Sequence, residues 1–408
     1  MRTGRRIAAG LLLAGLCIFL PFGTSASAAS LSIVGEFGGS NGAVPLGGNL
    51  IIDHADTLYG VTYAGGDHDL GVVFERVVGN PTTDLTAIHS FSGPEEARPV
   101  GPLAADAAGN LYGVTKEGGA ANLGTVFRLT RPAAGSTAWT LTTLHAFTGG
   151  TDGGDPEIGL TAGPGGAIYG TTCGGTIFKI AGGTSYSVVH VFTGTEGGCP
   201  KSTLVFDPAG DLIGTTTTFS PTPEDGGSLF KLDPAGHFTT VATFQIANGQ
   251  GSPGLAQVSG NLVRDSAGNI YGVAQWGGLG FPQHCCGGAI FVVTAITHKA
   301  SVFFGFPDNT QVSAGGIALD NAGNFYGTLT KDGQYGAGSV FQVSKAGTFT
   351  TLTTFNPAYE APVGGVIFDQ AGNLYGTTSA GYGTTTASCT SASVVAPVGC
   401  GTVYEVSP

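Results

Sequence analysis

Residues 106–115 read Asp-Ala-Ala-Gly-Asn-Leu-Tyr-Gly-Val-Thr, and copies of this stretch recur along the 408-residue chain at intervals of roughly 50 residues. Close copies lie at 265–273, 320–328 and 369–378. Looser copies lie at 53–62, 162–171 and 207–215, where Ile213 replaces the tyrosine. Repeats of this period are typical of propellers and solenoids, so the seven copies predict seven structural units.

Two further short runs follow each copy and suit β-strands. The first has the form Gly-x-x-aromatic and ends at Phe74, Phe127, Phe178, Phe230, Phe291, Phe341 and Tyr404. The second ends at Phe91, Phe147, Phe192, Phe244, Phe306 and Phe355. With a strand before the turn, they predict four antiparallel strands per unit, which in the sixth unit are 316–320, 324–328, 339–343 and 349–355. We expect the first strand of each unit to line a central axis.

The second set of phenylalanines has only six members after the first repeat. Phe37, at the end of residues 31–37, supplies a seventh ahead of the first repeat, and the last repeat stops after its third strand. Closing the ring in this way removes an exposed strand edge. The sequence therefore predicts an all-β, seven-bladed β-propeller of four-stranded antiparallel blades, closed by the N-terminal strand completing the C-terminal blade.

The constant residues of the motif have structural explanations. Asp-x-x-Gly-Asn is turn chemistry, because Asp and Asn bond to nearby backbone and Gly accepts positive φ. We expect the Tyr-Gly pair and the phenylalanines to serve packing, with the glycine letting neighbouring sheets approach. His89, His145 and His190 each stand two residues before an outer-strand phenylalanine, which indicates a shared packing niche.

The pattern resembles the choice-of-anchor tandem repeat proteins of the GloVer type, whose repeats carry Gly-Asn-Leu-Tyr-Gly-Thr-Thr followed by Gly-Gly and Gly-Thr-Val-Phe. Residues 109–127 and 372–378 match these motifs. The resemblance spans nearly the whole mature chain. It implies a tandem-repeat propeller and little about its biochemistry.

The first 28 residues predict a secretion signal peptide. Arg2, Arg5 and Arg6 precede an apolar run over 7–22, and Ala-Ser-Ala at 26–28 forms a small-residue cleavage site. Residues 29–408 then form a single propeller domain, expected to be secreted or extracytoplasmic. No second apolar stretch approaches the ~20 residues needed to cross a membrane.

Charge limits the class of partner. The chain has 27 acidic residues and 15 basic ones, of which three lie in the signal, so the mature net charge is about −15. Nucleic acid is excluded as a partner on this ground, because its recognition requires clustered Lys and Arg. We expect a monomer without a cofactor.

Six cysteines remain after removal of the signal, and export favours disulfides. All six map to the end of the propeller that carries the loops between second and third strands and between blades, which we call the loop face. Cys173 and Cys199 are predicted to pair, as are Cys389 and Cys400. The adjacent Cys285 and Cys286 form either a vicinal disulfide or free thiols. A zinc site is the rival interpretation, but the chain lacks a nearby Cys-x-x-Cys pair.

The candidate binding residues follow from exposure on the loop face or closeness to the axis. The loop candidates are Asp67, His68, Asp69, Trp276, Phe281, His284, Asp332, Tyr335 and Tyr382. Glu157 and Lys201, with Arg264, are the few ionisable residues expected near the axis. None of them forms a recognised catalytic or metal-binding spacing, and loop packing is the simpler explanation for each one.

Two functions remain open at this point. The first is a noncatalytic extracellular binding or scaffold protein, whose ligand is a glycan or a surface protein. The second is a polysaccharide lyase or glycoside hydrolase that uses Glu157, Asp67, His68 or His284 as acid or base. The propeller fold hosts both classes and does not decide between them.

Overall fold

The computed structural model describes residues 29–46, 50–80, 84–193, 196–217, 225–245, 255–277, 287–307, 310–332, 336–355, 361–379 and 400–407. These residues form an all-β fold, in which a single 3-10 turn at Pro164–Gly166 is the one helical element described. Within these ranges, no helix has the length and apolar character needed to cross a membrane.

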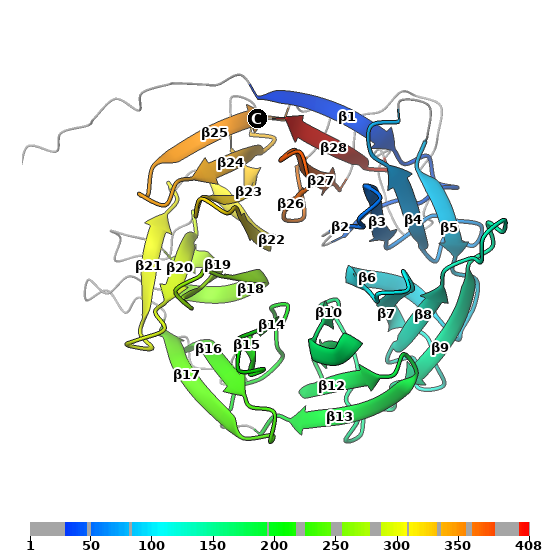
Figure 1. Cartoon of the computed structure of the whole chain (residues 1–408), viewed down its shortest axis with the longest axis horizontal. Helices are drawn as coiled ribbons and strands as arrows, with labels where there is room; N and C mark the ends of the chain where they lie inside the picture. The colour runs from blue at the N-terminus through cyan, green and yellow to red at the C-terminus, as the bar shows by residue number, and fades with distance from the viewer. Residues whose placement is uncertain are drawn as a thin grey trace, which may run out of the picture.

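The strands group into four-stranded antiparallel sheets around a common axis (Figure 1). The first sheet holds β2 (Ile51–Ile52), β3 (Thr57–Thr62), β4 (Val72–Val77) and β5 (Thr86–Ser90). The second holds β6 (Ala97–Ala105), β7 (Leu111–Glu117), β8 (Thr125–Thr130) and β9 (Thr140–Ala146). The third holds β10 (Thr161–Ala162), β11 (Ile168–Thr172), β12 (Thr176–Ala181) and β13 (Ser185–Val191). The fourth holds β14 (Val205–Phe206), β15 (Leu212–Thr216), β16 (Asp225–Leu232) and β17 (Phe238–Gln245).

The fifth set holds β18 (Leu255–Arg264), β19 (Ile270–Gly277), β20 (Ala289–Val293) and β21 (Ala300–Gly305). The sixth holds β22 (Gln311–Leu319), β23 (Phe325–Lys331), β24 (Ser339–Val343) and β25 (Phe349–Thr354). These two sets join into one eight-stranded sheet through a single parallel pair, Asn261 with Gly316. The terminal sheet holds β26 (Ile367–Phe368), β27 (Leu374–Thr378), β28 (Thr402–Ser407) and, at its outer edge, β1 (Ser30–Glu36).

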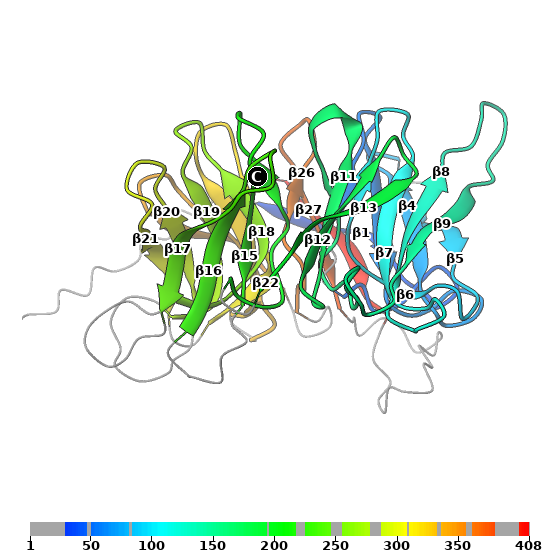
Figure 2. The ribbon, with the colours of Figure 1, turned by 90° about the horizontal axis from the view of Figure 1, so that it is seen from below.

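The order of strands within each sheet places the first strand innermost, as expected from the sequence. Figure 1 shows β6, β18 and β22 nearest the axis, and β9, β21 and β25 at the rim. Seen from the side, the sheets stand next to one another with their strands running between two faces (Figure 2). The first strands vary most in length, from two residues in β2 to ten in β18.

The turn between the first two strands is bonded to the tyrosine that follows it. Asp106 Oδ1 accepts the N–H groups of Ala108 and Asn110 at 2.9 and 3.0 Å, and its Oδ2 accepts the Tyr112 hydroxyl at 3.0 Å. Burial opposes ionisation, but these hydrogen bonds outweigh it and lower the pKa of Asp106. The same Tyr-to-Asp bond recurs in four other repeats: Tyr59–Asp53, Tyr271–Asp265, Tyr326–Asp320 and Tyr375–Asp369. The tyrosine therefore has a hydrogen-bonding role in addition to packing.

The glycine of the Tyr-Gly pair has a different role from the one the sequence suggested. Gly113 pairs with Phe127 on the next strand of its own sheet, and a methyl group at Gly113 would collide with that ring. The same relation holds for Gly60 and Phe74. The glycine therefore makes room for an aromatic ring of its own sheet, and this ring, not the glycine, contacts the neighbouring sheet.

Adjacent sheets are joined by edge-to-face pairs of aromatic rings. In each, the phenylalanine at the end of the outer strand or directly after it meets the third-strand ring of the next repeat. The pairs, with their centroid distances, are Phe37–Phe74 (5.0 Å), Phe91–Phe127 (5.3 Å), Phe147–Phe178 (5.6 Å), Phe192–Phe230 (5.2 Å), Phe244–Phe291 (5.0 Å), Phe306–Phe341 (4.9 Å) and Phe355–Tyr404 (4.9 Å).

The two ends of the chain meet in the terminal sheet, where β1 pairs antiparallel with β28 in the register Leu31 to Val406. The Phe37 N–H donates to the Gly401 carbonyl at 3.1 Å, and Phe147 N–H donates to the Gly124 carbonyl at 3.0 Å in the second sheet. Phe37 thus occupies the position that the other outer-strand phenylalanines occupy.

We expect Phe37→Ala to destabilise the protein as much as Phe147→Ala, by about 3–5 kcal/mol, because both rings are buried between two sheets. Ile296→Ala serves as the control, since the Ile296 side chain is 93% exposed. Urea unfolding monitored by circular dichroism measures the free energies of unfolding. A Phe37→Ala cost no greater than that of Ile296→Ala would show that the first strand does not support the fold.

Candidate functional site

A cavity of about 630 Å³ lies at the axis, which we call the axial pocket. Its wall includes Tyr63, which directly follows β3, together with Lys116 near the end of β7 and Gln275 near the end of β19. Because the loops after the second strands leave from this end, the axial pocket opens on the loop face. Leu46, Val100, Ile158 and Val258 supply apolar wall.

Two positions of the repeat supply much of this wall. One is the residue that follows Tyr-Gly-x-x, which is Tyr63, Lys116, Thr217 and Gln275 in different sheets. The other lies three or four places before the leucine that recurs in or directly before the first strand, and it is Leu46, Val100, Glu157, Lys201 and Ser259. Both positions differ in chemistry from one repeat to the next, so the axial pocket receives side chains of different kinds.

The charged part of the axial pocket is an ion cluster of residues from three sheets. The Glu157 carboxylate is hydrogen-bonded to Lys201 Nζ through one oxygen and to Lys116 Nζ at 3.1 Å through the other. Lys116 Nζ also lies 3.8 Å from Asp155 Oδ1. Burial raises the pKa of Glu157, but the two lysines outweigh it, so the pKa lies below its ordinary value. Glu157 is therefore a stably ionised carboxylate.

The rim of the axial pocket is held by residues in the left-handed backbone region. Arg98 and Gln257 have φ values of 60° and 51°. The Arg98 guanidinium donates to the backbone carbonyls of Tyr63 and Asp69 at 3.2 and 2.9 Å and lies 5.0 Å from the Tyr63 ring centroid. Arg98 therefore fixes the Tyr63 ring beside the axial pocket and ties the loop containing Asp69 to it.

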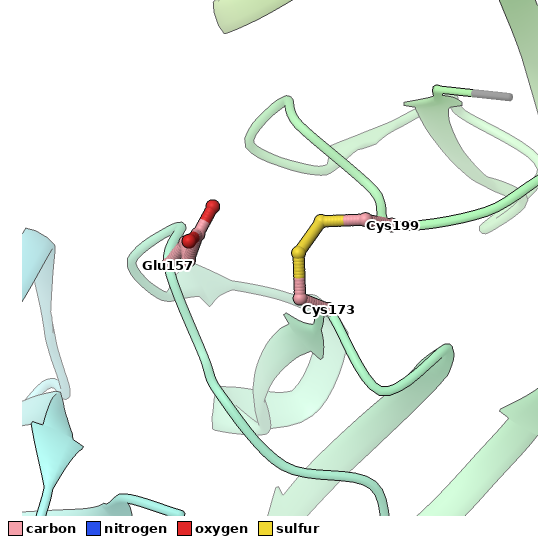
Figure 3. A group of neighbouring side chains, drawn as sticks. All are labelled: Glu157, Cys173 and Cys199. Carbon is pink, nitrogen blue, oxygen red and sulfur yellow. A yellow bond between two sulfur atoms is a disulfide. The ribbon is translucent and has the colours of Figure 1, made fainter. Parts of the chain in front are cut away.

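Cys173 and Cys199 form the predicted disulfide, which joins the loop after β11 to the segment leading into the fourth sheet. Figure 3 shows the disulfide beside Glu157. The carboxylate and the two sulfurs lie within 4.8 Å of one another, as in a three-ligand metal site. The sulfurs are bonded to each other, however, so in this oxidised form they are not the thiolates that would bind zinc.

The sequence candidates divide into three groups. Glu157 and Lys201 meet in the axial pocket. Asp69 lies outside it and builds its loop, because its carboxylate accepts the Gly65 N–H at 2.9 Å, as Asn122 does from Gly118 in the second sheet. Asp332 likewise accepts the Ser339 hydroxyl at 2.8 Å.

Asp67 and His68 are exposed on the same loop and are not part of the axial pocket wall. Trp276 lies in β19, with only its backbone described. Phe281, His284, Tyr335, Tyr382, Cys285, Cys286 and Cys389 lie outside the described residues. Cys400 is buried and disulfide-bonded, while its predicted partner Cys389 is one of those residues.

The three histidines lie between an aromatic ring and a carboxylate. His145 stacks on Tyr186 at 3.6 Å between centroids, and its Nε2 lies 3.1 Å from Asp152 Oδ2. His190 has the same neighbours in kind, Phe238 and Glu196. These contacts are consistent with the packing niche expected from the sequence.

Sequence reasoning missed Lys116, Tyr63, Gln257 and Gln275. For Tyr63, Lys116 and Gln275 the available signal was the divergence of one position inside a nearly constant motif, whereas Gln257 lies outside that position. A residue that varies where its neighbours do not is free of the packing constraints that fix those neighbours.

We expect Glu157→Gln to lower the free energy of unfolding by roughly 1 kcal/mol at pH 7, because it removes a partly exposed carboxylate shared by two lysines. The folded pKa of Glu157 is lowered, so its contribution is present above about pH 4.3 and is lost as the pH falls through the folded pKa. Urea unfolding at pH 7 and at pH 3 measures the loss of unfolding free energy that Glu157→Gln causes at each pH, and this loss should be smaller at pH 3. Glu95→Gln, at an exposed carboxylate, is the control; an equal loss at both pH values would argue against the ion cluster.

The double substitution Cys173→Ser and Cys199→Ser should cost about 2–4 kcal/mol of stability, because the bond closes a loop with a sequence separation of 26 residues. Non-reducing peptide mapping should recover a peptide pair that joins Cys173 to Cys199. Recovery of Cys173 joined to Cys389 instead would contradict the pairing.

Comparison with solved structures finds propeller-like neighbours at low sequence identity. YCF48 bound to D1 peptide aligns with a TM-score of 0.52 and 9% identity, covering 94% of this chain and 96% of that one. A gluconolactonase from Xanthomonas campestris aligns with a TM-score of 0.42 and 12% identity over 90% of this chain and 97% of its own. The first of these supports a shared fold, and the second score is too low to carry an argument.

No curated protein matches the chain in sequence. The family model of the Gloeobacter/Verrucomicrobia repeat matches residues 22–175 and, as a second overlapping match, 82–263. Together these matches cover more than half of the chain, which agrees with the resemblance drawn from the repeated motif. The chain belongs to the Gloeobacter/Verrucomicrobia repeat family.

Proposed function

We propose that this protein is a closed, seven-bladed β-propeller that acts outside the cytoplasm as a noncatalytic binding protein, with a glycan held in the axial pocket. The observation that carries the proposal is that two variable positions of the repeat converge on one cavity. A pocket whose wall has a different side chain from each repeat is suited to one asymmetric ligand.

Closure of the ring is supported by the contacts at the seam. The Val44 N–H donates to the Cys400 carbonyl at 2.9 Å, as Arg98 N–H does to Leu70 between the first and second sheets. A methyl group on Gly401 would lie 2.8 Å from Pro45 Cδ. The corresponding distance from Gly124 to Pro156 Cδ is 2.9 Å. The junction between the chain ends is thus built like an internal junction.

Placement outside the cytoplasm is supported by two independent features. The first 28 residues have the three-part form of a secretion signal. The Cys173–Cys199 disulfide also suits an oxidising compartment, since disulfides are rare in the cytosol.

Binding is favoured over catalysis by the state of Glu157. A general acid for glycoside hydrolysis needs a raised pKa, whereas two lysines hold this carboxylate ionised. Among the described residues that line the axial pocket, Glu157 is the only carboxylate. The paired-carboxylate arrangement of glycosidases is therefore not formed by the described wall of the pocket.

A sugar residue suits the chemistry of the axial pocket. The charges of Glu157 and its two lysines balance only together with Asp155 beside Lys116, while Gln275 and Thr217 offer neutral hydrogen-bonding groups. The Tyr63 ring adds an apolar surface of the kind that a sugar ring packs against. A surface-protein segment is the alternative ligand, and YCF48 is a propeller-like structure bound to a peptide.

The test is to measure glycan binding and product release together, using the purified full chain and a panel of polysaccharides. We expect binding to at least one glycan without release of reducing ends. Gln275→Ala should weaken that binding by about three- to tenfold, because it removes a neutral hydrogen bond in a concave site. Gln370→Ala, in the turn between β26 and β27, should leave binding unchanged.

Turnover that Glu157→Gln or His68→Ala abolishes would contradict the noncatalytic assignment. If the purified chain binds a surface protein but no glycan, and Gln275→Ala abolishes that binding, the ligand of the axial pocket is a protein and not a glycan.

A further inference from the structure

A second cavity, of about 720 Å³, opens between the fifth and sixth sheets. We call it the turn groove, and its wall includes Arg264, Tyr271, Phe303, Asn321, Phe325 and Lys345. Arg264 is the last residue of β18 and Tyr271 the second residue of β19, whereas Val258 and Gln275 of the same strands line the axial pocket. The turn groove is therefore at the opposite end of these strands and is a separate site.

Both cations of the turn groove are positioned by the repeated turn. A methyl group on Gly268 would lie 3.1 Å from Arg264 Nη2, and one on Gly323 would lie 3.1 Å from Lys345 Cδ. Each side chain thus lies over the glycine of a turn, where a larger residue would displace it. Neither cation has a carboxylate within ion-pair distance among the described residues.

The equivalent junction between the first and second sheets has contacts that the turn groove lacks. There Arg131, the counterpart of Lys345, lies over Gly109 and pairs with Asp53 at 3.6 Å. Trp139 packs edge-on against Tyr59 at 6.1 Å between centroids. The turn that bears Lys345 is shorter and carries no tryptophan, so the corresponding space is open. Asp265, the counterpart of Asp53, lines the turn groove, but no ion pair joins it to Lys345 among the described residues.

The carboxylates of the turn groove are already engaged. Asp265 accepts hydrogen bonds from the backbone and side chain of Asn269 and from Tyr271. Asp320 accepts the same set from Asn324 and Tyr326. Asp265 and Asp320 stay ionised, but their oxygens are used inside the turns, so Arg264 and Lys345 are the charged groups of the turn groove that remain to bond a ligand.

The apolar part of the turn groove is a cluster of three mutually contacting rings. Tyr271 lies 4.7 Å from Phe325 and 5.6 Å from Phe303 between centroids, and Phe303 lies 5.1 Å from Phe325. Phe325 is buried, so the partly exposed Tyr271 and Phe303 supply the aromatic surface of the turn groove. Aromatic surface beside a cation fits a molecule that has both an apolar ring face and a negative charge.

We propose that the turn groove binds an acidic saccharide, in which a uronic acid residue packs on the aromatic cluster and its carboxylate bonds to Arg264 and Lys345. The site does not depend on the axial pocket, and its ligand is recognised by charge as well as by the sugar ring. With the axial pocket at the other end of the same strands, it gives the protein two saccharide contacts on opposite faces.

The test is titration calorimetry of the full chain with oligogalacturonate, its methyl ester and inorganic phosphate. We expect the acid form to bind and the ester to bind about tenfold more weakly or less, because esterification removes the charge that the cations recognise. Arg264→Gln and Lys345→Gln should each weaken binding of the acid form by about tenfold. Lys331→Gln, at the other end of β23, changes the net charge equally and should leave binding unchanged.

Asn321→Trp should block the turn groove without removing a cation, because Asn321 is exposed in the turn that borders it. Gln275→Ala, in the axial pocket, should not affect this binding. The proposal is overturned if acid and ester bind equally, if the two cation variants bind as the unmodified chain does, if phosphate binds as tightly as the saccharide, or if only Gln275→Ala abolishes binding.

Discussion

An aromatic ring on the third strand of each sheet fills the space left by a glycine on the second strand, and the phenylalanine that ends the preceding sheet meets that ring edge-on. Gly113, Phe127 and Phe91 are one such set. This ring contact has two effects: it fixes the packing inside one sheet, and it sets the distance to the next sheet. Between most neighbouring sheets no strand pairing is needed, since the rings hold them.

This packing also explains where the site can form. Residues at the constant positions are committed to the ring contact and to the turn, in which Tyr112 bonds to Asp106. The residues that face the axis are not part of either contact, so they can differ between repeats at no cost to the fold. Lys116 and Gln275 occupy the same position of the motif and supply different chemistry to one pocket.

Much of the fold was predictable because its causes are local. The turn, the strand alternation and the spacing of the phenylalanines are visible within one repeat. The position of Phe37 ahead of the first repeat predicted that the strand before it pairs with the last strand. The glycine of the Tyr-Gly pair was assigned to the wrong contact, because a sequence does not show which ring fills an empty position. Asp69 was named as a binding candidate, but it builds its loop in the way Asn122 does.

The sequence by itself determined the repeat, the type of each element and the residues that each turn requires, because these depend on neighbours along the chain. Only the tertiary structure decided which charges meet. Glu157 is separated by 41 residues from Lys116 and by 44 from Lys201, and the three come together because three sheets converge on the axis. Among the described residues, Arg264 and Lys345 have no such carboxylate partner, although Asp265 and Asp320 line the same groove. Which charged side chains pair across sheets depends on the rotation from one unit to the next about the axis. The spacing of residues along the chain does not encode this rotation.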